Sequence, residues 1–187
     1  MAYVVVIGGV RSTGKSAVAR VLGTVLQADV LSSGRVREII RAQHTLAERP
    51  DLFESISGAP SCATAVKFLR AQAAIMQPSF QAAIQQPLPR KAKYILEDVH
   101  FYPGFLQHLS VALHVILVSS PETLQTRIRS DEVGSGRSVN VERVIELQEY
   151  FKQEAQRLSI PIIDSTELIW ALVDVLKRLP RRGIEPF

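Results

Sequence analysis

The chain has 187 residues, of which 47% are hydrophobic and 21% charged, and its net charge of +4 comes from 22 Lys and Arg against 18 Asp and Glu. These values are typical of one ordinary globular domain, and the small basic excess suits an anionic ligand without indicating nucleic acid by itself. The single cysteine excludes an internal disulfide and a cysteine-rich metal site, and no apolar run reaches the roughly 20 residues of a membrane span. We therefore expect one domain over 1–187, located in the cytoplasm, without a secretory leader or membrane anchor.

Five apolar runs predict β-strands, because β-branched residues dominate most of them and the runs are nearly continuous, as in a parallel sheet covered on both faces. They span 3–8, 28–32, 93–98, 113–119 and 160–164. Helical patterns fill the intervals. Strands that alternate with helices predict an α/β fold with a doubly wound, five-stranded parallel sheet.

The expected helices carry apolar stripes that we expect to face the core. The stripe positions are Val18, Leu22, Val25 and Leu26; Val36, Ile39 and Ile40; Val66, Leu69, Ala73, Met76, Phe80 and Ile84; Val141, Val144, Ile145, Gln148, Phe151, Ala155 and Leu158; and Leu168, Ile169, Leu172, Val173, Leu176 and Leu179. Pro78 is expected to kink the third helix, and Asn140 is a candidate N-cap of the fourth.

Two irregular stretches, 47–62 and 130–138, are long for connections in a compact domain, and loops of this length are often lids over a site. Gly134 and Gly136 would give the second stretch a hinge. We expect 130–138 to form a short lid and the region 33–90 to lie on the acceptor side of a cleft.

The first strand is followed by GVRSTGKS at 9–16, which fits the P-loop pattern G-x-x-x-x-G-K-[ST] at every position and precedes an amphipathic helix. Glycines allow a tight turn whose N–H groups point at phosphate oxygens, Lys15 would reach the β and γ phosphates, and the Ser16 hydroxyl would coordinate Mg²⁺. We expect the nucleotide to be bound by Gly9, Val10, Arg11, Ser12, Thr13, Gly14, Lys15, Ser16 and Ala17. The GTPase pattern N-K-x-D does not occur, and the short single domain favours a small-molecule or nucleotide kinase.

Glu97 and Asp98 end the third strand, at the edge of a parallel sheet where ligands bind. A carboxylate there would meet Mg²⁺ beside Ser16. Because consecutive strand residues face opposite sides, we expect only one of the two acids to point into the cleft. A solvated acidic strand end is the alternative.

Three arginines, Arg127, Arg129 and Arg137, follow the fourth strand. A guanidinium group suits the spread charge of a transferring phosphoryl group because it is planar and permanently charged. Arg127 and Arg129 share a helical segment but diverge in direction, whereas the neighbouring glycines would carry Arg137 over the nucleotide. Lid closure would also exclude water. A solvated helix face with surface arginines is the alternative.

A second cluster of arginines, Arg35, Arg37 and Arg41, opens the helix after the second strand. Cations near a helix N-terminus are mildly unfavourable, so a role in gripping an anionic acceptor through paired hydrogen bonds is favoured. The candidate acceptor-binding residues are Arg35, Arg37, Glu38, Arg70 and His100. Solvated surface arginines and a structural histidine remain alternatives.

Three segments, GGVRSTGKS, SSGRVREIIRAQ and LEDVHFYPG, together resemble the archaeal-type 2-phosphoglycerate kinases. The family patterns R-E-x-x-R and E-G-x-H-x-x-P-G are matched by Arg37, Glu38 and Arg41, and by Glu97, His100, Pro103 and Gly104. The resemblance extends more loosely over the lid and the following helix. It implies a nucleoside-kinase-like fold, favours Glu97 over Asp98 as the metal ligand, and implies transfer from ATP to the free hydroxyl of 2-phosphoglycerate, giving 2,3-bisphosphoglycerate.

The chain departs from that family at three points. Ser33 stands where the family commonly has an aspartate that could serve as the base for the acceptor hydroxyl, and Asp98 replaces the usual glycine after Glu97. We hypothesise that Asp98 takes over the role of the base. The additional N-terminal regulatory region of some members is also expected to be lacking.

These observations predict a P-loop NTPase fold and an ATP-dependent kinase that uses Mg²⁺ and acts on a small anionic metabolite or nucleotide. The predicted catalytic residues are Lys15, Arg127, Arg129, Arg137 and Asp98, and the predicted metal ligands are Ser16 and Glu97. No aromatic-plus-basic stripe favours nucleic acid as a partner. A nucleoside or nucleotide kinase, and an ATP-dependent switch without a small acceptor, remain alternatives.

Overall fold

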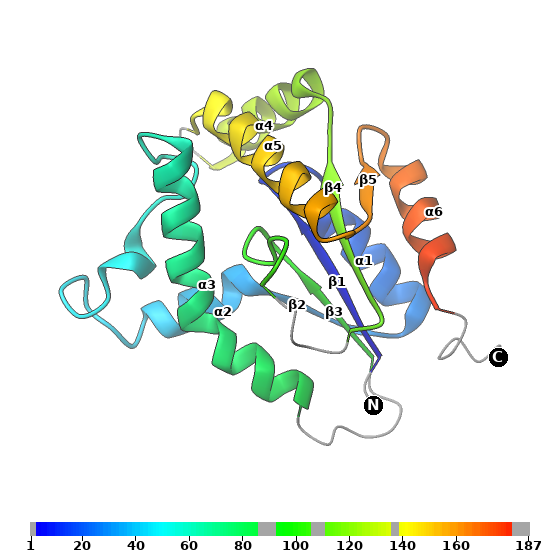
Figure 1. Cartoon of the computed structure of the whole chain (residues 1–187), viewed down its shortest axis with the longest axis horizontal. Helices are drawn as coiled ribbons and strands as arrows, with labels where there is room; N and C mark the ends of the chain where they lie inside the picture. Colours follow the sequence, from blue (N-terminus) through cyan, green and yellow to red (C-terminus); the bar gives the residue numbers. More distant parts are fainter. Residues whose placement is uncertain (1–2, 86–92, 106–110, 136–138, 181–187) are drawn as a thin grey trace.

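The computed structural model describes residues 3–85, 93–105, 111–135 and 139–180 (Figure 1). The elements in chain order are β1 (Tyr3–Gly9), α1 (Lys15–Leu26), β2 (Asp29–Ser32), α2 (Ser33–Arg41), the 3₁₀ helix η1 (Pro50–Phe53), α3 (Cys62–Gln85), β3 (Lys93–Glu97), β4 (Leu113–Val118), α4 (Pro121–Ser135), α5 (Val141–Arg157), β5 (Ile162–Asp164) and α6 (Leu168–Arg178). None of the helices in these ranges is both long and apolar enough to cross a membrane.

The five strands form one parallel sheet in the order β2-β3-β1-β4-β5, as the apolar runs predict. Ile7 of β1 pairs with Glu97 of β3 on one side and with Val115 of β4 on the other. The carboxyl ends of the strands therefore meet at one edge of the sheet, at the end opposite the N label in Figure 1. A parallel sheet binds ligands at this edge.

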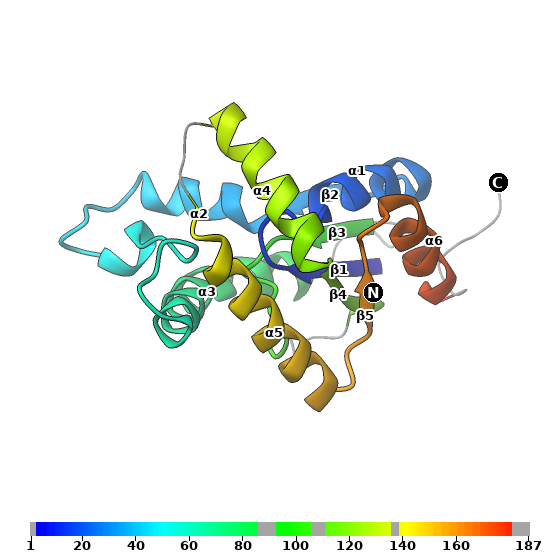
Figure 2. The same cartoon turned by 90° about the horizontal axis from the view of Figure 1, so that it is seen from above.

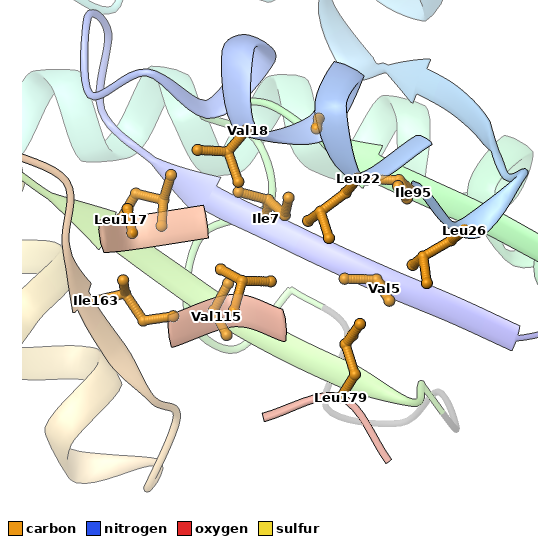
Figure 3. Close-up of a cluster of buried hydrophobic side chains, with 13 residues drawn as sticks. Val5, Ile7, Val18, Leu22, Leu26, Ile95, Val115, Leu117, Ile163 and Leu179 are labelled. Atoms are coloured by element: carbon orange, nitrogen blue, oxygen red, sulfur yellow. The ribbon is translucent and has the colours of Figure 1, made fainter. Parts of the chain in front are cut away.

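Helices cover both faces of the sheet, and Figure 2 shows α1 and α6 on one side with α3 and α5 on the other. The first face is closed by a cluster in which Val5 and Ile7 meet Val18 and Leu22 of α1, as Figure 3 shows. Successive strand residues point to opposite faces, so Val4 and Val6 of the same strand pack with α3 instead. A strand buried on both faces explains why the sequence there is continuously apolar.

Most predicted helix features are confirmed. The Asn140 side chain accepts a hydrogen bond from the Arg143 N–H and caps α5. Pro78 lies inside α3, which changes direction in its second half in Figure 1. The buried face of α5 includes Val144, Phe151 and the polar Gln148.

Three stripe positions are not in the core. Val25, Ile39 and Ile169 are 51%, 62% and 61% exposed. In α1 the buried arc is centred on Ala19 and Leu22, and Val25 lies beyond its border. The helices α2 and α6 each have another layer on one side only, so their outer apolar residues face solvent. The side chain of Ile84 lies outside the described part of the chain.

The two stretches predicted to be irregular have different outcomes. The stretch 47–62 contains only η1 before α3 begins at Cys62. The prediction for 130–138 is wrong for 130–135, because α4 continues to Ser135 and contains Gly134 in its last turn. Residues 136–138, including Gly136, lie outside the described residues, so the lid role stays a prediction.

Candidate active site

The loop between β1 and α1 has the conformation that its glycines predict. Gly9 and Gly14 have φ angles of 145° and 85°, which side-chain-bearing residues rarely adopt. A Cβ at Gly14 would lie 2.2 Å from Leu168 Cδ2. The loop is therefore open to a ligand on one side and packed against the start of α6 on the other, with the N-terminus of α1 at its end.

Lys15 is the first residue of α1 and folds back over the loop. Its Nζ donates to the Val10 carbonyl at 2.7 Å, and the side chain is 7% exposed. Burial lowers the pKa of Lys15 from its ordinary value, against the opposing effect of the Asp98 and Glu97 carboxylates. A lysine held at this point can interact with a polyphosphate wrapped by the loop.

Ser16 and Glu97 form a polar pair beside the loop. The Ser16 hydroxyl donates to Glu97 Oε2 at 3.0 Å, and Glu97 is 6% exposed at the end of β3. Hydroxyl and carboxylate oxygens suit Mg²⁺, which usually keeps waters and phosphate oxygens as its remaining ligands. The described residues contain no group of three or more His, Cys, Asp or Glu able to hold a metal alone. The pair therefore fits an Mg²⁺ ion whose remaining ligands come from a bound nucleotide and water.

Asp98 also lines the cleft, so the prediction that only one of the two acids points inward is wrong. The strand ends at Glu97, and strand alternation does not extend to the next residue. Asp98 Oδ2 accepts the Gly34 N–H at 2.6 Å and the Ser32 hydroxyl at 3.4 Å, and Oδ1 accepts the Val99 N–H at 2.5 Å. A Cβ at Gly34 would lie 2.8 Å from Oδ2, so glycine allows this approach.

The environment of Asp98 favours its charged form. Burial by itself would raise the pKa of this carboxyl, but the charge of Lys15 and the hydrogen bond from the Val99 N–H hold it below its usual range. Asp98 is therefore a carboxylate at neutral pH, seated against the N-terminus of α2, where a negative charge is favourable.

A cleft of about 880 Å³ lies at the carboxyl edge of the sheet. Its P-loop half is lined by Val10, Arg11, Ser12, Gly14, Lys15, Ser16, Ala17, Arg127 and Leu168. Its α2 half is lined by Ser32, Gly34, Arg37, Arg41, residues 53–57, His100 and Arg143. Glu97 and Asp98 lie with these residues in the same lining. Of the predicted nucleotide-binding residues, only Gly9 and Thr13 are not in the lining; both are buried behind the loop.

The predicted lid arginines have three different outcomes. Arg127 lines the cleft and is held by the backbone after β5, where its guanidinium donates to the Ser165 and Thr166 carbonyls at 3.0 and 2.8 Å. Arg129 is exposed and is not in the lining, since residues two apart on a helix diverge. Arg137 lies outside the described residues.

Only some of the predicted acceptor-binding residues line the cleft. Arg37 lines the α2 half, but Arg35, Glu38 and Arg70 are exposed and lie outside the lining. Glu38 pairs with Arg37 at 3.0 Å, and this hydrogen bond lowers the pKa of Glu38. Arg70 donates to the Tyr150 hydroxyl at 2.8 Å instead.

His100 is in the lining but is not a cation. It is 2% exposed, and burial lowers its pKa to about 4 although Asp98 opposes the shift. Its Nδ1 is 2.8 Å from the Ser33 hydroxyl and its Nε2 is 2.9 Å from Gln72 Oε1. Both ring nitrogens are engaged within the protein, so the prediction that His100 grips an anion directly is not supported by the geometry.

The known proteins that are similar to this chain agree with the family resemblance of its motifs. No family model matches the chain. The 2-phosphoglycerate kinase of Pyrococcus furiosus is 23% identical over 97% of this chain and 65% of the relative, and that of Thermococcus kodakarensis is 24% identical over 96% and 68%. The chain is similar over nearly its whole length to 2-phosphoglycerate kinases. It spans 65% to 68% of the length of these relatives.

Solved structures share the fold. TT1252 from Thermus thermophilus has a TM-score of 0.58 at 20% identity, covering 94% of this chain and 95% of that one. A gluconokinase from Sinorhizobium meliloti has a TM-score of 0.50 at 13% identity, covering 94% and 88%. The predicted α/β P-loop fold, and the resemblance to 2-phosphoglycerate kinases read from three motifs, are therefore confirmed.

Several cleft residues are absent from the sequence-based prediction. Arg143 lines the α2 half, where it donates to the Ala59 and Pro60 carbonyls at 3.1 and 2.9 Å. Arg41, which belongs to the arginine cluster predicted on the acceptor side, lines the same half, and its guanidinium lies 4.6 Å from the centre of the Phe53 ring. Arg143 has no spacing signal that could have placed it, because the segments that meet here are far apart in the chain.

Proposed function

We propose that this chain is a phosphotransferase that moves the γ-phosphoryl group of ATP to the free hydroxyl of 2-phosphoglycerate, giving 2,3-bisphosphoglycerate. The observation that carries the proposal is the Ser16–Glu97 pair next to the buried Lys15, in a cleft that continues to Arg37 and Arg41. The similar proteins named 2-phosphoglycerate kinase supply the acceptor.

In the P-loop half, the loop amides and the N-terminus of α1 would bind the phosphates, and Lys15 would stabilise the negative charge that develops on the transferring group. Ser16 and Glu97 would hold Mg²⁺, which neutralises phosphate charge when it is bound. Arg127 is fixed by backbone carbonyls and would position the nucleotide at the other end of this half.

In the α2 half, Arg37 and Arg41 would bind the phosphate and carboxylate of the acceptor through charge-assisted hydrogen bonds. The acceptor oxygen would attack the γ phosphorus, the bond from that phosphorus to the bridging oxygen of ADP would break, and the hydroxyl proton would pass to Asp98. The Asp98 carboxylate is 2.6 Å from the Gly34 N–H, directly beside Ser33. A carboxylate is therefore present at the start of α2 although Ser33 replaces the aspartate common in the family.

An ADP-release assay with MgATP tests the proposal over small phosphorylated acids, nucleosides and nucleotides. We expect 2-phosphoglycerate to raise ADP release at least about tenfold above the level without acceptor, because a kinase excludes water from the transferring group. 3-Phosphoglycerate is the matched control, since it carries the same charges with the hydroxyl displaced. If only a nucleoside or nucleotide raised ADP release, that compound and not 2-phosphoglycerate would be the acceptor. If no compound raised ADP release, an ATP-dependent switch would be favoured.

A further inference from the structure

A glutamine interrupts the apolar face of α3. Gln72 is 0% exposed and lies between Leu69, Ala73 and Met76, which are buried in the same helix. Burying an amide is unfavourable unless its hydrogen bonds are replaced inside the protein. Position 72 follows Leu69 by three residues and precedes Met76 by four, so a polar residue shares the face of these apolar ones.

All four hydrogen-bonding positions of this amide are used. Its Nε2 donates to the Asp51 carbonyl at 2.8 Å and to the Glu54 carbonyl at 2.9 Å. Its Oε1 accepts from Arg37 Nη1 at 3.1 Å and contacts His100 Nε2 at 2.9 Å. An amide has two N–H donors and two acceptor positions, so none remains free.

These bonds fix the direction of the neighbouring protons. Because the Gln72 nitrogen faces two carbonyls, its oxygen must be the acceptor toward His100, and His100 Nε2 must carry the ring proton. His100 Nδ1 is then an acceptor, and the Ser33 hydroxyl donates to it at 2.8 Å. The chain of hydrogen bonds runs from the start of α2 to the Asp51 and Glu54 carbonyls.

The groups that Gln72 joins come from three separate segments of the α2 half. Arg37 is on α2, Glu54 follows η1, and His100 follows β3; all three line the cleft, whereas Gln72 does not. Arg37 also has a buried Nε without a hydrogen-bond partner, so its bond to Gln72 is one of few that fix its guanidinium.

We infer that Gln72 is a positioning residue for the acceptor: its amide ties the 51–54 segment, Arg37 and His100 into one geometry of the α2 half. The inference rests on the proposed function, because it assigns acceptor binding to that half. The four hydrogen bonds of Gln72 reach Arg37, His100 and the 51–54 segment and not the P-loop, so we expect its effect on the acceptor and not on ATP.

Two variants test the amide, one by removing all of its hydrogen bonds and one by removing only its donors. Gln72→Leu removes all four bonds, whereas Gln72→Glu keeps oxygen acceptors for Arg37 and His100 but cannot donate to the two carbonyls. We expect the KM for 2-phosphoglycerate to rise about tenfold or more in both variants, with the KM for ATP changed less than about twofold. Equal rises in both KM values, or an unchanged acceptor KM in a folded Gln72→Leu protein, would overturn the inference.

Gln148 supplies the matched control. It is also a buried glutamine, 3% exposed, and it exchanges two hydrogen bonds of 2.9 Å with the Ser119 backbone beside Arg127. Gln148→Leu should lose comparable stability while the KM for 2-phosphoglycerate stays within about twofold of the parent. A rise of the acceptor KM equal to that of Gln72→Leu would show a general effect of lost stability and would contradict the inference.

A spectroscopic measurement on the unaltered protein does not depend on the reaction. Imidazole ¹⁵N shifts should show His100 as the neutral tautomer protonated at Nε2, and this tautomer should persist in Gln72→Glu. A ring protonated at Nδ1 would overturn the hydrogen-bond chain. If no acceptor raises ADP release in the parent protein, the proposed function fails, and the tautomer still decides whether Gln72 organises this half of the cleft.

Discussion

Most of the P-loop half of the cleft comes from one continuous segment, the loop after β1 and the first turn of α1, whereas the α2 half is assembled from α2, the 53–57 segment, the turn after β3 and the first turn of α5. In the first half, the proposed binding groups are backbone amides and a helix N-terminus, which the local conformation arranges. In the second half, side chains such as Gln72 and Arg143 hold segments that are distant in the chain. A binding function that the backbone performs is therefore readable from a motif, and one that distant side chains assemble is not.

The largest effect is expected in the P-loop half, on replacement of Lys15. Lys15→Ala should lower kcat/KM about 10³-fold or more, because the charge that stabilises the transferring phosphoryl is lost. Steady-state ADP release measures this. Lys152→Ala is the matched control, since Lys152 makes only a surface ion pair with Glu149 at 2.9 Å. A Lys15→Ala protein that bound MgATP and turned over like the parent would contradict the role of the P-loop.

Asp98 lies where the halves meet, and its replacement should have the next largest effect. Asp98→Asn keeps an oxygen for the Gly34 N–H but removes the base, so kcat should fall about 10²-fold with ATP affinity retained. Single-turnover kinetics and ATP titration distinguish these two quantities. Unchanged turnover would remove Asp98 from the mechanism.

The buried His100 makes the α2 half sensitive to acid. Its folded pKa of about 4 is below the unfolded value of 6.5, so the unfolded chain binds a proton that the folded protein does not, and stability falls as pH decreases through this window. Between pH 7 and pH 5 the free energy of unfolding should fall by about 2 kcal/mol from this group, about 30-fold in the unfolding equilibrium.

Urea unfolding at both pH values measures this change. Burial also lowers the pKa of His114 to about 4, although its contact with the Phe101 carbonyl opposes the shift, so the whole protein will show a larger change. The difference between the parent and His100→Leu isolates the first histidine. An identical pH dependence in the two proteins would mean that His100 is not held neutral.

The smallest effect is expected in the α2 half, on the conservative replacement of Arg37. Arg37→Lys keeps the charge but loses the planar donors, so the KM for 2-phosphoglycerate should rise about tenfold while the KM for ATP stays unchanged. Initial rates over a grid of both substrates separate the two constants. A rise confined to the KM for ATP would contradict this prediction, because Arg37 would then act on the nucleotide and not on the acceptor.

Much of the fold was predictable because each element carries its own signal. The five apolar runs, the Asn140 cap and the glycine loop are local features, and the structure confirms them. The errors arise where local periodicity does not decide. Ile39 has helical spacing but no layer of the protein outside it, and Asp98 escapes strand alternation because the strand ends one residue earlier.

The candidate site was predictable where it depends on strand order, and not where it depends on contacts between distant segments. The contact between Ser16 and Glu97 follows from strand order, since β3 lies beside β1 and their carboxyl ends align. Arg35 and Arg37 cannot be told apart from sequence, because their separation depends on which face of α2 meets α3. Arg143 donates to the Ala59 and Pro60 carbonyls, a long-range contact for which a single sequence has no signal.

The most direct measurement of the central claim is ³¹P NMR of a reaction that contains the protein, MgATP and 2-phosphoglycerate. We expect the γ resonance of ATP to decrease while a second phosphomonoester resonance, coupled to the C3 methylene of 2,3-bisphosphoglycerate, increases in equal amount. Growth of inorganic phosphate alone, or no change in ATP, would contradict the account of a cleft that joins a nucleotide to an anionic acceptor.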